Sequence, residues 1–255
     1  MQSVKFDRAA TFYDETCGFP AGTEQDAARL FAMAGNITGD TRIVEPGIGT
    51  GRVALPLAQL TGASVVGVDL SNPMMLQLRG KQYYEDITVI CGDAMCLPLP
   101  DGTFDAAVIT HVFHLVADWQ QALAEIGRVL RPGGALLYSW TQFDENDFMR
   151  EWHEVLGRRP TNRFATFSST KFLDEAGWTR CGDNQQLTYS VSRSPNDYIN
   201  SLKDRIWSST WKLTDAEIAS GVEKLTVAAD RYNLPIDVPL QRDATFSVAP
   251  YSPQM

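Results

Sequence analysis

A loop with three glycines at alternate positions constrains the fold of this chain more than any other feature of its sequence. The loop lies in residues 44–52 (VEPGIGTGR) and follows a short β-branched run at 41–45 (TRIVE). Glycines at this spacing let the backbone pass close to a ligand, because no Cβ atom interferes. At the carboxyl edge of a parallel sheet, such a loop lies where ligands bind. The sequence therefore predicts a ligand-binding turn between a first strand and a helix.

Four further apolar runs follow this loop and alternate with helical patterns. The runs are ASVVGVDL (63–70), ITVIC (87–91), FDAAVIT (104–110) and ALLYSW (135–140). Nearly continuous apolar character is typical of strands that are buried on both faces of a parallel sheet. The repeated β-α order predicts an α/β fold with a doubly wound, Rossmann-like sheet.

The segments between these runs contain helix signals. Asn72 is suited to cap a helix that begins at Pro73, and Asp118 is suited to cap a second helix. Pro56 is awkward inside a helix, so we expect a kink or an early end in the helix predicted over 51–60.

Acidic residues lie at the carboxyl ends of three successive predicted strands, at Glu45, Asp69 and Asp93. Asp69 comes 18 residues after Gly51 (69 − 51), where a carboxylate can accept hydrogen bonds from both hydroxyls of a ribose. Asp69 could instead cap a helix, but Ser71 and Asn72 already supply that cap. Three acids and a glycine loop on one rim suit a cationic, hydroxyl-rich ligand.

A dinucleotide is the main alternative ligand for the glycine loop. Its fingerprint, G-x-G-x-x-G, requires a glycine where this chain has Arg52. Glu45 is also unfavourable beside a pyrophosphate and favourable beside a cationic amino-acid ligand. A tight strand-to-helix turn that binds nothing is the structural alternative.

The charge balance and the cysteines exclude several classes of protein. The chain has 22 basic and 31 acidic residues, a net charge of −9, and no lysine or arginine run, so we expect no nucleic-acid partner. Its four cysteines form no CxxC pair, which argues against a zinc site and for free thiols in the cytoplasm. No apolar run is long enough for a membrane span, and the N-terminus is unlike a signal peptide.

Four segments together resemble the class I S-adenosylmethionine-dependent methyltransferases that act on small molecules, such as the ubiquinone/menaquinone-biosynthesis and trans-aconitate methyltransferases. They are E-x-G-x-G-x-G at 45–51, VVGVDLS at 65–71, GDAMCLPLPDGTFDAAVITHVFHLVAD at 92–118 and EIGRVLRPGGALLYSW at 125–140. The resemblance covers about residues 6–192. It implies transfer of a methyl group to O, N or C of a small metabolite, with S-adenosylhomocysteine as product. A nicotinamide-dependent oxidoreductase and a non-catalytic methyltransferase-like module stay open as alternatives.

The resemblance also implies an organisation for the chain. We expect a single domain over 1–255 whose sheet has about seven strands, the last one antiparallel. A helical lid at 1–40 precedes a cofactor-binding core at 41–140. Acceptor-lid insertions follow at 141–166 and 195–240, and the remaining sheet elements lie at 168–192 and 242–250. The sequence leaves open whether the protein is a monomer or a homodimer.

Site residues follow from the same resemblance. Glu45 and the glycine loop would hold the methionine part of the cofactor, and Asp69 the ribose. The expected cofactor-binding residues are Tyr13, Glu45, Gly47, Gly49, Gly51, Asp69, Leu70, Met74, Asp93, Ala94, Met95, Thr110 and His111.

The acceptor site is less well defined by the sequence. His111 and His114 are the candidate catalytic residues, although a base is needed only if the acceptor must lose a proton. His114 could equally pack in the loop before Asp118. The candidate acceptor-binding residues are Tyr13, His114 and Trp140. A further hypothesis is an acceptor carboxylate held by Arg158, Arg159 or Arg163, and no metal is expected.

Overall fold

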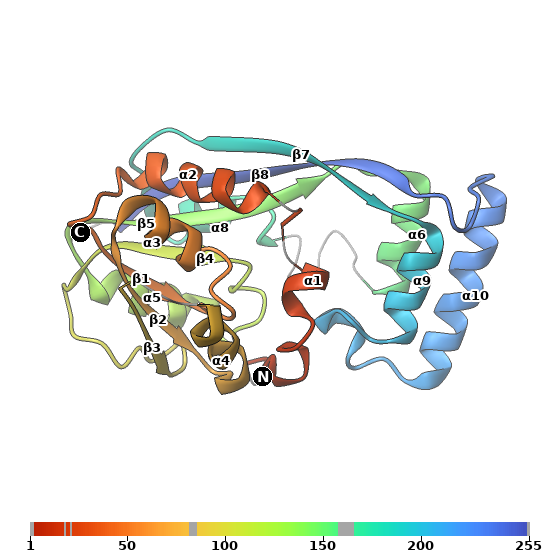
Figure 1. Cartoon of the computed structure of the whole chain (residues 1–255), viewed down its shortest axis with the longest axis horizontal. Coiled ribbons are helices and arrows are strands. Elements are labelled where there is room, and N and C mark those ends of the chain that lie inside the picture. The colour runs from red at the N-terminus through yellow and green to blue at the C-terminus, as the bar shows by residue number, and fades with distance from the viewer. Residues whose placement is uncertain (1–2, 18, 21, 82–85, 158–165, 254–255) are drawn as a thin grey trace. The chain divides into compact units, whose positions relative to one another are not determined.

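The computed structural model describes residues 3–17, 19–20, 22–81, 86–157 and 166–253 (Figure 1). Over these residues, eight strands form one sheet in the order β3-β2-β1-β4-β5-β8-β6, and β7 pairs with β8. Neighbouring strands from β3 to β5 are parallel, whereas β6 and β8 are antiparallel. This mostly parallel sheet confirms the predicted α/β fold class.

The elements have the following bounds. The strands are β1 Arg42–Pro46, β2 Ser64–Asp69, β3 Ile87–Cys91, β4 Phe104–Thr110, β5 Leu130–Phe143, β6 Trp178–Arg180, β7 Gln185–Arg193 and β8 Leu240–Pro253. The helices are α1 Tyr13–Cys17, α2 Thr23–Gly35, α3 Ala54–Thr61, α4 Asn72–Lys81, α5 Trp119–Val129, α6 Asp147–Val155, α8 Lys171–Glu175, α9 Pro195–Lys203 and α10 Asp215–Arg231, with 3-10 turns at Asp7–Ala9 and Ser208–Thr210.

The first three strands end at the same edge of the sheet. In the β1–β2 pair, Pro46 lies opposite Val68, and in the β2–β3 pair, Asp69 lies opposite Cys91. The loops that leave these strands therefore start side by side, as the positions of the three acids predict.

The chain forms two compact units. The first contains Met1–Thr141, Phe167–Leu187 and Phe246–Met255, and the second contains Gln142–Thr166 and Thr188–Thr245. The strands β5, β7 and β8 each run from one unit into the other along the chain. The second unit holds nearly all of both segments that we expected as acceptor lid.

The first unit has its core on both sides of the parallel strands. On one side, α5 buries Leu123 and Ile126 in the main apolar cluster. In the N-terminal region, α2 buries Phe31, whose ring centroid is 6.0 Å from that of Phe246 in β8. This helix is therefore a packed part of the fold.

The second unit has an aromatic core of its own. Its helices α6, α9 and α10 bury residues such as Leu202 and Leu225 against one another. The ring of Tyr198 lies 5.9 Å from Phe148 and 5.4 Å from Trp152. Aromatic residues of this unit therefore serve packing.

Local expectations about three helices are partly wrong. The helix α3 continues through Pro56, because this residue lies in the first turn, where a backbone N–H has no intrahelical partner to lose. The cap of α4 is the Ser71 hydroxyl, which accepts from the Met74 amide at 3.4 Å, and Asn72 is its first helical residue. At α5, Asp118 accepts from the Gln121 amide at 3.1 Å, which confirms the predicted cap.

The helix α6 lies within the stretch 141–166. Its cap is Asn146, whose side chain accepts from the Met149 amide at 2.9 Å. The helix buries Phe148, Met149 and Trp152.

Candidate functional site

A pocket lies in the first unit at the carboxyl edge of β1, β2, β3 and β4. It encloses about 630 Å³, including its open mouth. Ten of the expected residues line it: Tyr13, Gly47, Gly49, Asp69, Leu70, Met74, Asp93, Ala94, Thr110 and His111. The structure therefore brings the glycine loop and two of the three acids into one cavity.

The glycine loop is shaped by neighbours that leave no room for side chains. Gly47, Gly49 and Gly51 all have positive φ, at 76°, 55° and 73°. A Cβ atom at Gly47 would lie 2.4 Å from a methyl carbon of Val112, and one at Gly51 would lie 2.3 Å from Leu78. Gly51 does not line the pocket, so its part in the site is to let the loop pack on α4.

The carboxylate of Asp69 ties the glycine loop to the end of β2. One of its oxygens accepts from the Gly49 amide at 2.9 Å, and the other accepts from the Ser71 amide at 2.8 Å. Burial raises the pKa of this carboxyl, and the two amides oppose that rise. Asp69 also lines the pocket, so one side chain both shapes the loop and faces the cavity.

Glu45 is a buried acid at the base of the glycine loop. Its side chain does not line the pocket, and the residue is 4% exposed. Among the described residues, its Oε2 atom has no hydrogen-bond partner. Burial raises the pKa of Glu45 to about 8, while the nearby charge of Arg52 acts to lower it. A buried acceptor without a partner beside a glycine cradle fits a ligand that brings a cation or a donor.

Replacing Glu45 by glutamine should change the pH dependence of stability. The folded pKa of about 8 lies above the value of about 4.3 expected for an unfolded glutamate. The neutral carboxyl therefore stabilises the fold fully below the unfolded pKa, and this contribution is lost as pH rises through 8. Between pH 5 and pH 8, we expect the free energy of unfolding of the wild type to fall relative to Glu45→Gln by about 3 to 4 kcal/mol.

Urea denaturation of both proteins across that pH range measures this difference. The glutamine variant is the matched control, since it has the same shape and no charge to gain. Parallel pH profiles for the two proteins would contradict a raised pKa at Glu45.

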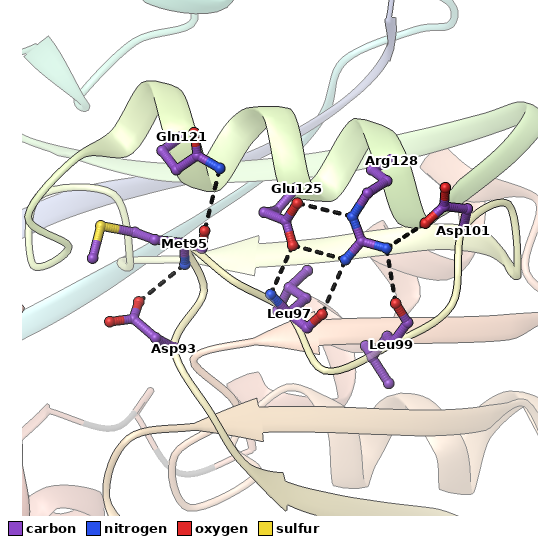
Figure 2. A network of polar contacts seen from close by, with 8 residues as sticks. All are labelled: Asp93, Met95, Leu97, Leu99, Asp101, Gln121, Glu125 and Arg128. Carbon is purple, nitrogen blue, oxygen red and sulfur yellow. Dashed lines mark hydrogen bonds and ion pairs between the residues drawn. The ribbon is translucent and has the colours of Figure 1, made fainter.

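The loop that carries Asp93 and Ala94 is fastened to α5 (Figure 2). Arg128 donates to the carbonyl oxygens of Leu97 at 2.9 Å and Leu99 at 2.8 Å. Glu125 accepts from the Leu97 amide at 2.8 Å and from Arg128 at 2.7 Å. Hydrogen bonding to Arg128 holds the pKa of Glu125 below its usual range, so the ion pair is charged at neutral pH.

Two further side chains form hydrogen bonds to the backbone at the start of this loop (Figure 2). Asp93 accepts from the Met95 amide at 3.0 Å, and Gln121 donates to the Met95 carbonyl at 3.3 Å. Met95 itself does not line the pocket. Its expected part in the site is therefore limited to its backbone, which lies between Asp93 and α5.

His111 stands at the end of β4 with a backbone φ of 56°, in the left-handed region that a residue with a side chain rarely adopts. Burial, together with the charges of Arg52 and His114, lowers the pKa of its imidazole to about 3. A neutral imidazole therefore faces the pocket at physiological pH, beside Thr110.

Two residues expected at the acceptor site lie elsewhere. His114 does not line the pocket. Trp140 is 7% exposed and belongs to the main apolar cluster, where its ring centroid lies 6.0 Å from that of Tyr138. The strand β5 continues to Phe143, and Trp140 within it points into the core. The three candidate arginines, Arg158, Arg159 and Arg163, lie outside the described residues.

Sequence reasoning missed eight residues that line the pocket: Ser3, Val4, Phe6, Val68, Gly92, Val112, Leu115 and Val116. The last three belong to the apolar stretch that follows β4, which is a local signal. Ser3 and Val4 arrive through contacts that are distant in sequence. The Val4 amide donates to the Leu115 carbonyl at 3.0 Å, and the Ala117 amide donates to the Ser3 hydroxyl at 3.2 Å.

In the part of the chain that the structure describes, no group of histidine, cysteine and acidic residues is arranged to hold a metal ion. No described helix has the length and apolar character needed to cross a membrane.

A mostly parallel sheet with a glycine loop after β1 and acids at the ends of β1, β2 and beyond β3 is typical of the Rossmann-like methyltransferases. Residues 44–138 match the model of the family described as "Methyltransferase domain". The match covers the central part of the chain, which carries the glycine loop and the three acids.

Relatives and solved structures agree with this match. A demethylmenaquinone methyltransferase of Thermus thermophilus is 43% identical over 99 residues, which are 38% of this chain and 45% of the relative. A malonyl-[acyl-carrier protein] O-methyltransferase of Yersinia pestis is 31% identical over 163 residues, 64% of this chain and 58% of the relative. The chain thus spans about half the length of the curated relatives that it matches.

The fold has counterparts among solved structures. Phosphoethanolamine N-methyltransferase 2 of Haemonchus contortus, solved with phosphomonomethylethanolamine and S-adenosylhomocysteine, has a TM-score of 0.55 and 19% identity. The similarity covers 97% of this chain and 58% of the other. At this identity, the likeness shows a shared fold.

Proposed function

We propose that this protein transfers a methyl group from S-adenosylmethionine to O, N or C of a small metabolite. The observation that carries the proposal is the single pocket in which the glycine loop, Asp69 and Asp93 meet. The loop has the cradle shape that a Cβ atom would fill, and Glu45 below it has an acceptor oxygen without a partner among the described residues. These features fit a ligand with a cationic amino-acid end and a ribose.

The residues that line this pocket, with Glu45 at the base of the glycine loop, would bind different parts of the cofactor. Glu45 and the backbone of the glycine loop would hold the methionine end, and Asp69 would accept from the ribose hydroxyls. Leu70 and Met74 would flank the adenine, while Asp93 and the Ala94 amide would bond its edge. The expected product of the cofactor is S-adenosylhomocysteine.

When bound, the cofactor supplies a methyl carbon that is already electrophilic. The protein's task is then to hold the acceptor in line with that carbon and to exclude water. Phe6, Val112 and Leu115 provide apolar walls for this purpose. His111 is neutral and would orient an acceptor hydroxyl or amine by accepting a hydrogen bond from it, whereas its pKa of about 3 makes it a weak general base. Tyr13 faces the same space.

The proposed acceptor is a small metabolite, and no particular compound is favoured. The names of the two relatives refer to demethylmenaquinone and to malonyl-[acyl-carrier protein], so they favour no single acceptor. An acidic chain with no basic run supports a partner other than nucleic acid. The free thiols of Cys17, Cys91, Cys96 and Cys181 support a cytoplasmic location.

Binding and turnover test the proposal separately. Titration calorimetry with S-adenosylmethionine, S-adenosylhomocysteine and NADH should show binding of the first two only. Incubation with metabolite pools should then give a product heavier by one CH2 unit, detected by mass spectrometry. NADH binding without S-adenosylmethionine binding would favour an oxidoreductase, and cofactor binding without any product would favour a non-catalytic module.

The loop that carries Asp93 offers a second test. Replacing Arg128 by alanine removes its bonds to Leu97 and Leu99, and we expect about tenfold weaker S-adenosylmethionine binding because the adenine side of the pocket loses its order. Arg131→Ala is the matched control, because Arg131 is exposed and pairs only with Asp105 among the described ion pairs. Calorimetry should show an unchanged affinity of this control for S-adenosylmethionine. Equal loss in both variants would contradict a specific role for Arg128.

A further inference from the structure

The helix α1 reaches the pocket without an apolar anchor of its own. It spans Tyr13–Cys17, and none of its residues is buried. Its first residue, Tyr13, nevertheless lines the pocket. Helices are ordinarily held in a fold by a buried apolar face, so polar contacts must hold this one.

Three residues provide most of those polar contacts, and we call Asp14, Thr50 and Lys81 the clamp. The Thr50 hydroxyl donates to one carboxylate oxygen of Asp14 at 2.6 Å. The ammonium of Lys81 forms an ion pair with the other oxygen. Lys81 also donates to the Thr50 carbonyl at 3.1 Å. The clamp thus connects α1 to both the glycine loop and the C-terminal end of α4.

A second contact acts beside the clamp. Arg52, the residue after the glycine loop, donates to the Cys17 carbonyl at the end of α1. Its guanidinium carbon lies 5.8 Å from the centroid of the Tyr13 ring. Both ends of α1 are therefore attached to residues next to the glycines that shape the pocket.

The part of the N-terminal segment before α1 contacts α4 through the 3-10 turn Asp7–Ala9, and Ala9 is buried. Ser3 and Val4 bond to the loop at 115–117, and the ring of Phe6 meets that of Tyr13 edge-on at 5.9 Å. Phe6 and Tyr13 both line the pocket. Movement of α1 away from the clamp would therefore open one wall of the cavity.

We propose that Asp14 and Lys81 are positioning residues whose ion pair, with Thr50, holds Tyr13 against the cofactor pocket and limits the rate at which cofactor and product exchange. This inference rests on the proposed function. The Lys81 and Asp14 side chains are 36% and 43% exposed. Salt screens ion pairs that are open to solvent, so exchange should become faster as ionic strength rises.

Dissociation of S-adenosylhomocysteine, followed by stopped-flow tryptophan fluorescence, tests the clamp. We expect Asp14→Asn and Lys81→Met each to raise the dissociation rate about fivefold in low salt, the scale of an exposed ion pair. Each variant should also lose most of the salt dependence seen in the wild type. The exchanged pair Asp14→Lys with Lys81→Asp should recover part of the slow rate.

The control is Glu175→Gln, which breaks the exposed Lys171–Glu175 pair in α8 of the same unit. It should leave both the rate and its salt dependence unchanged. Unchanged dissociation in both single clamp variants would overturn the inference, and so would an equal effect of the control.

A wild-type protein that binds no S-adenosylhomocysteine would contradict the proposed function rather than the clamp. In that case, hydrogen exchange of the free protein tests whether the clamp holds α1 in place. Faster exchange at residues 13–17 in Asp14→Asn, with the sheet unchanged, would support the clamp. Identical exchange in the wild type and the variant would overturn it.

Discussion

Replacing Asp69 by alanine should weaken S-adenosylmethionine binding by about 3 kcal/mol, or on the order of 100-fold, because several charge-assisted hydrogen bonds are lost together. The bonds to the Gly49 and Ser71 amides are lost in the free protein. The bonds proposed to the ribose hydroxyls are lost in the complex. One substitution therefore loosens the loop and removes a contact to the ligand.

Two variants separate these contributions. Asp69→Asn keeps the shape of the side chain and one acceptor oxygen. Its affinity for S-adenosylmethionine should therefore lie between those of the wild type and the alanine variant. Asp105→Asn is the control, because Asp105 lies on β4 outside the pocket, where it accepts from the Arg42 amide at 2.7 Å. Titration calorimetry provides the affinities. Wild-type affinity in Asp69→Ala would refute the ribose assignment.

Replacing Gly51 by alanine should lower the free energy of unfolding by about 3 kcal/mol, from left-handed backbone strain and from overpacking. The backbone φ is 73°, and the new Cβ atom would lie 2.3 Å from a methyl carbon of Leu78. Either the loop or α4 must move to relieve that contact. Urea denaturation measures the loss of stability.

Gly102 offers a matched control for this substitution. Its φ is 59°, and a Cβ atom there would meet nothing within 4 Å. Gly102→Ala should therefore show only the backbone strain, about 1 kcal/mol. The difference between the two variants gives the cost of the contact with Leu78. Equal losses would show that packing against α4 adds nothing.

The cofactor side of the pocket could be predicted from the sequence because its signals are local. Each acid or glycine follows an apolar run, and parallel strands end at one edge, so Asp69, Asp93 and the loop had to meet. The positions of Thr110 and His111 could be predicted in the same way, since Thr110 is the last residue of β4 and His111 follows it directly. The pocket confirms that these positions lie together.

The remaining errors have separate physical causes. Trp140 lies three residues before the end of β5, and the direction of its side chain depends on packing with Tyr138, which no local pattern reports. The pocket wall formed by Ser3 and Val4 depends on bonds to residues more than 100 positions away. Pro56 was misjudged because the exact start of α3 decides whether a proline is harmful.

The second unit is built from two stretches of chain that depend on each other. Arg242 is 7% exposed; its guanidinium donates to the Asp144 carbonyl at 3.0 Å and to the Tyr198 hydroxyl at 3.2 Å. The Asp144 amide in turn donates to the Asp243 carbonyl at 2.9 Å. Neither stretch would keep its buried polar groups satisfied without the other.

Because the two stretches depend on each other, a chimeric protein must receive both of them together. A chimera that takes its second unit from a different methyltransferase must exchange 142–166 and 188–245 as a pair, with four junctions placed at the bounds of the unit. Three of those junctions fall inside or beside β5, β7 and β8, so the donor strands must match the recipient in register. Exchange of a single segment would instead leave the buried Arg242 guanidinium without the Asp144 carbonyl.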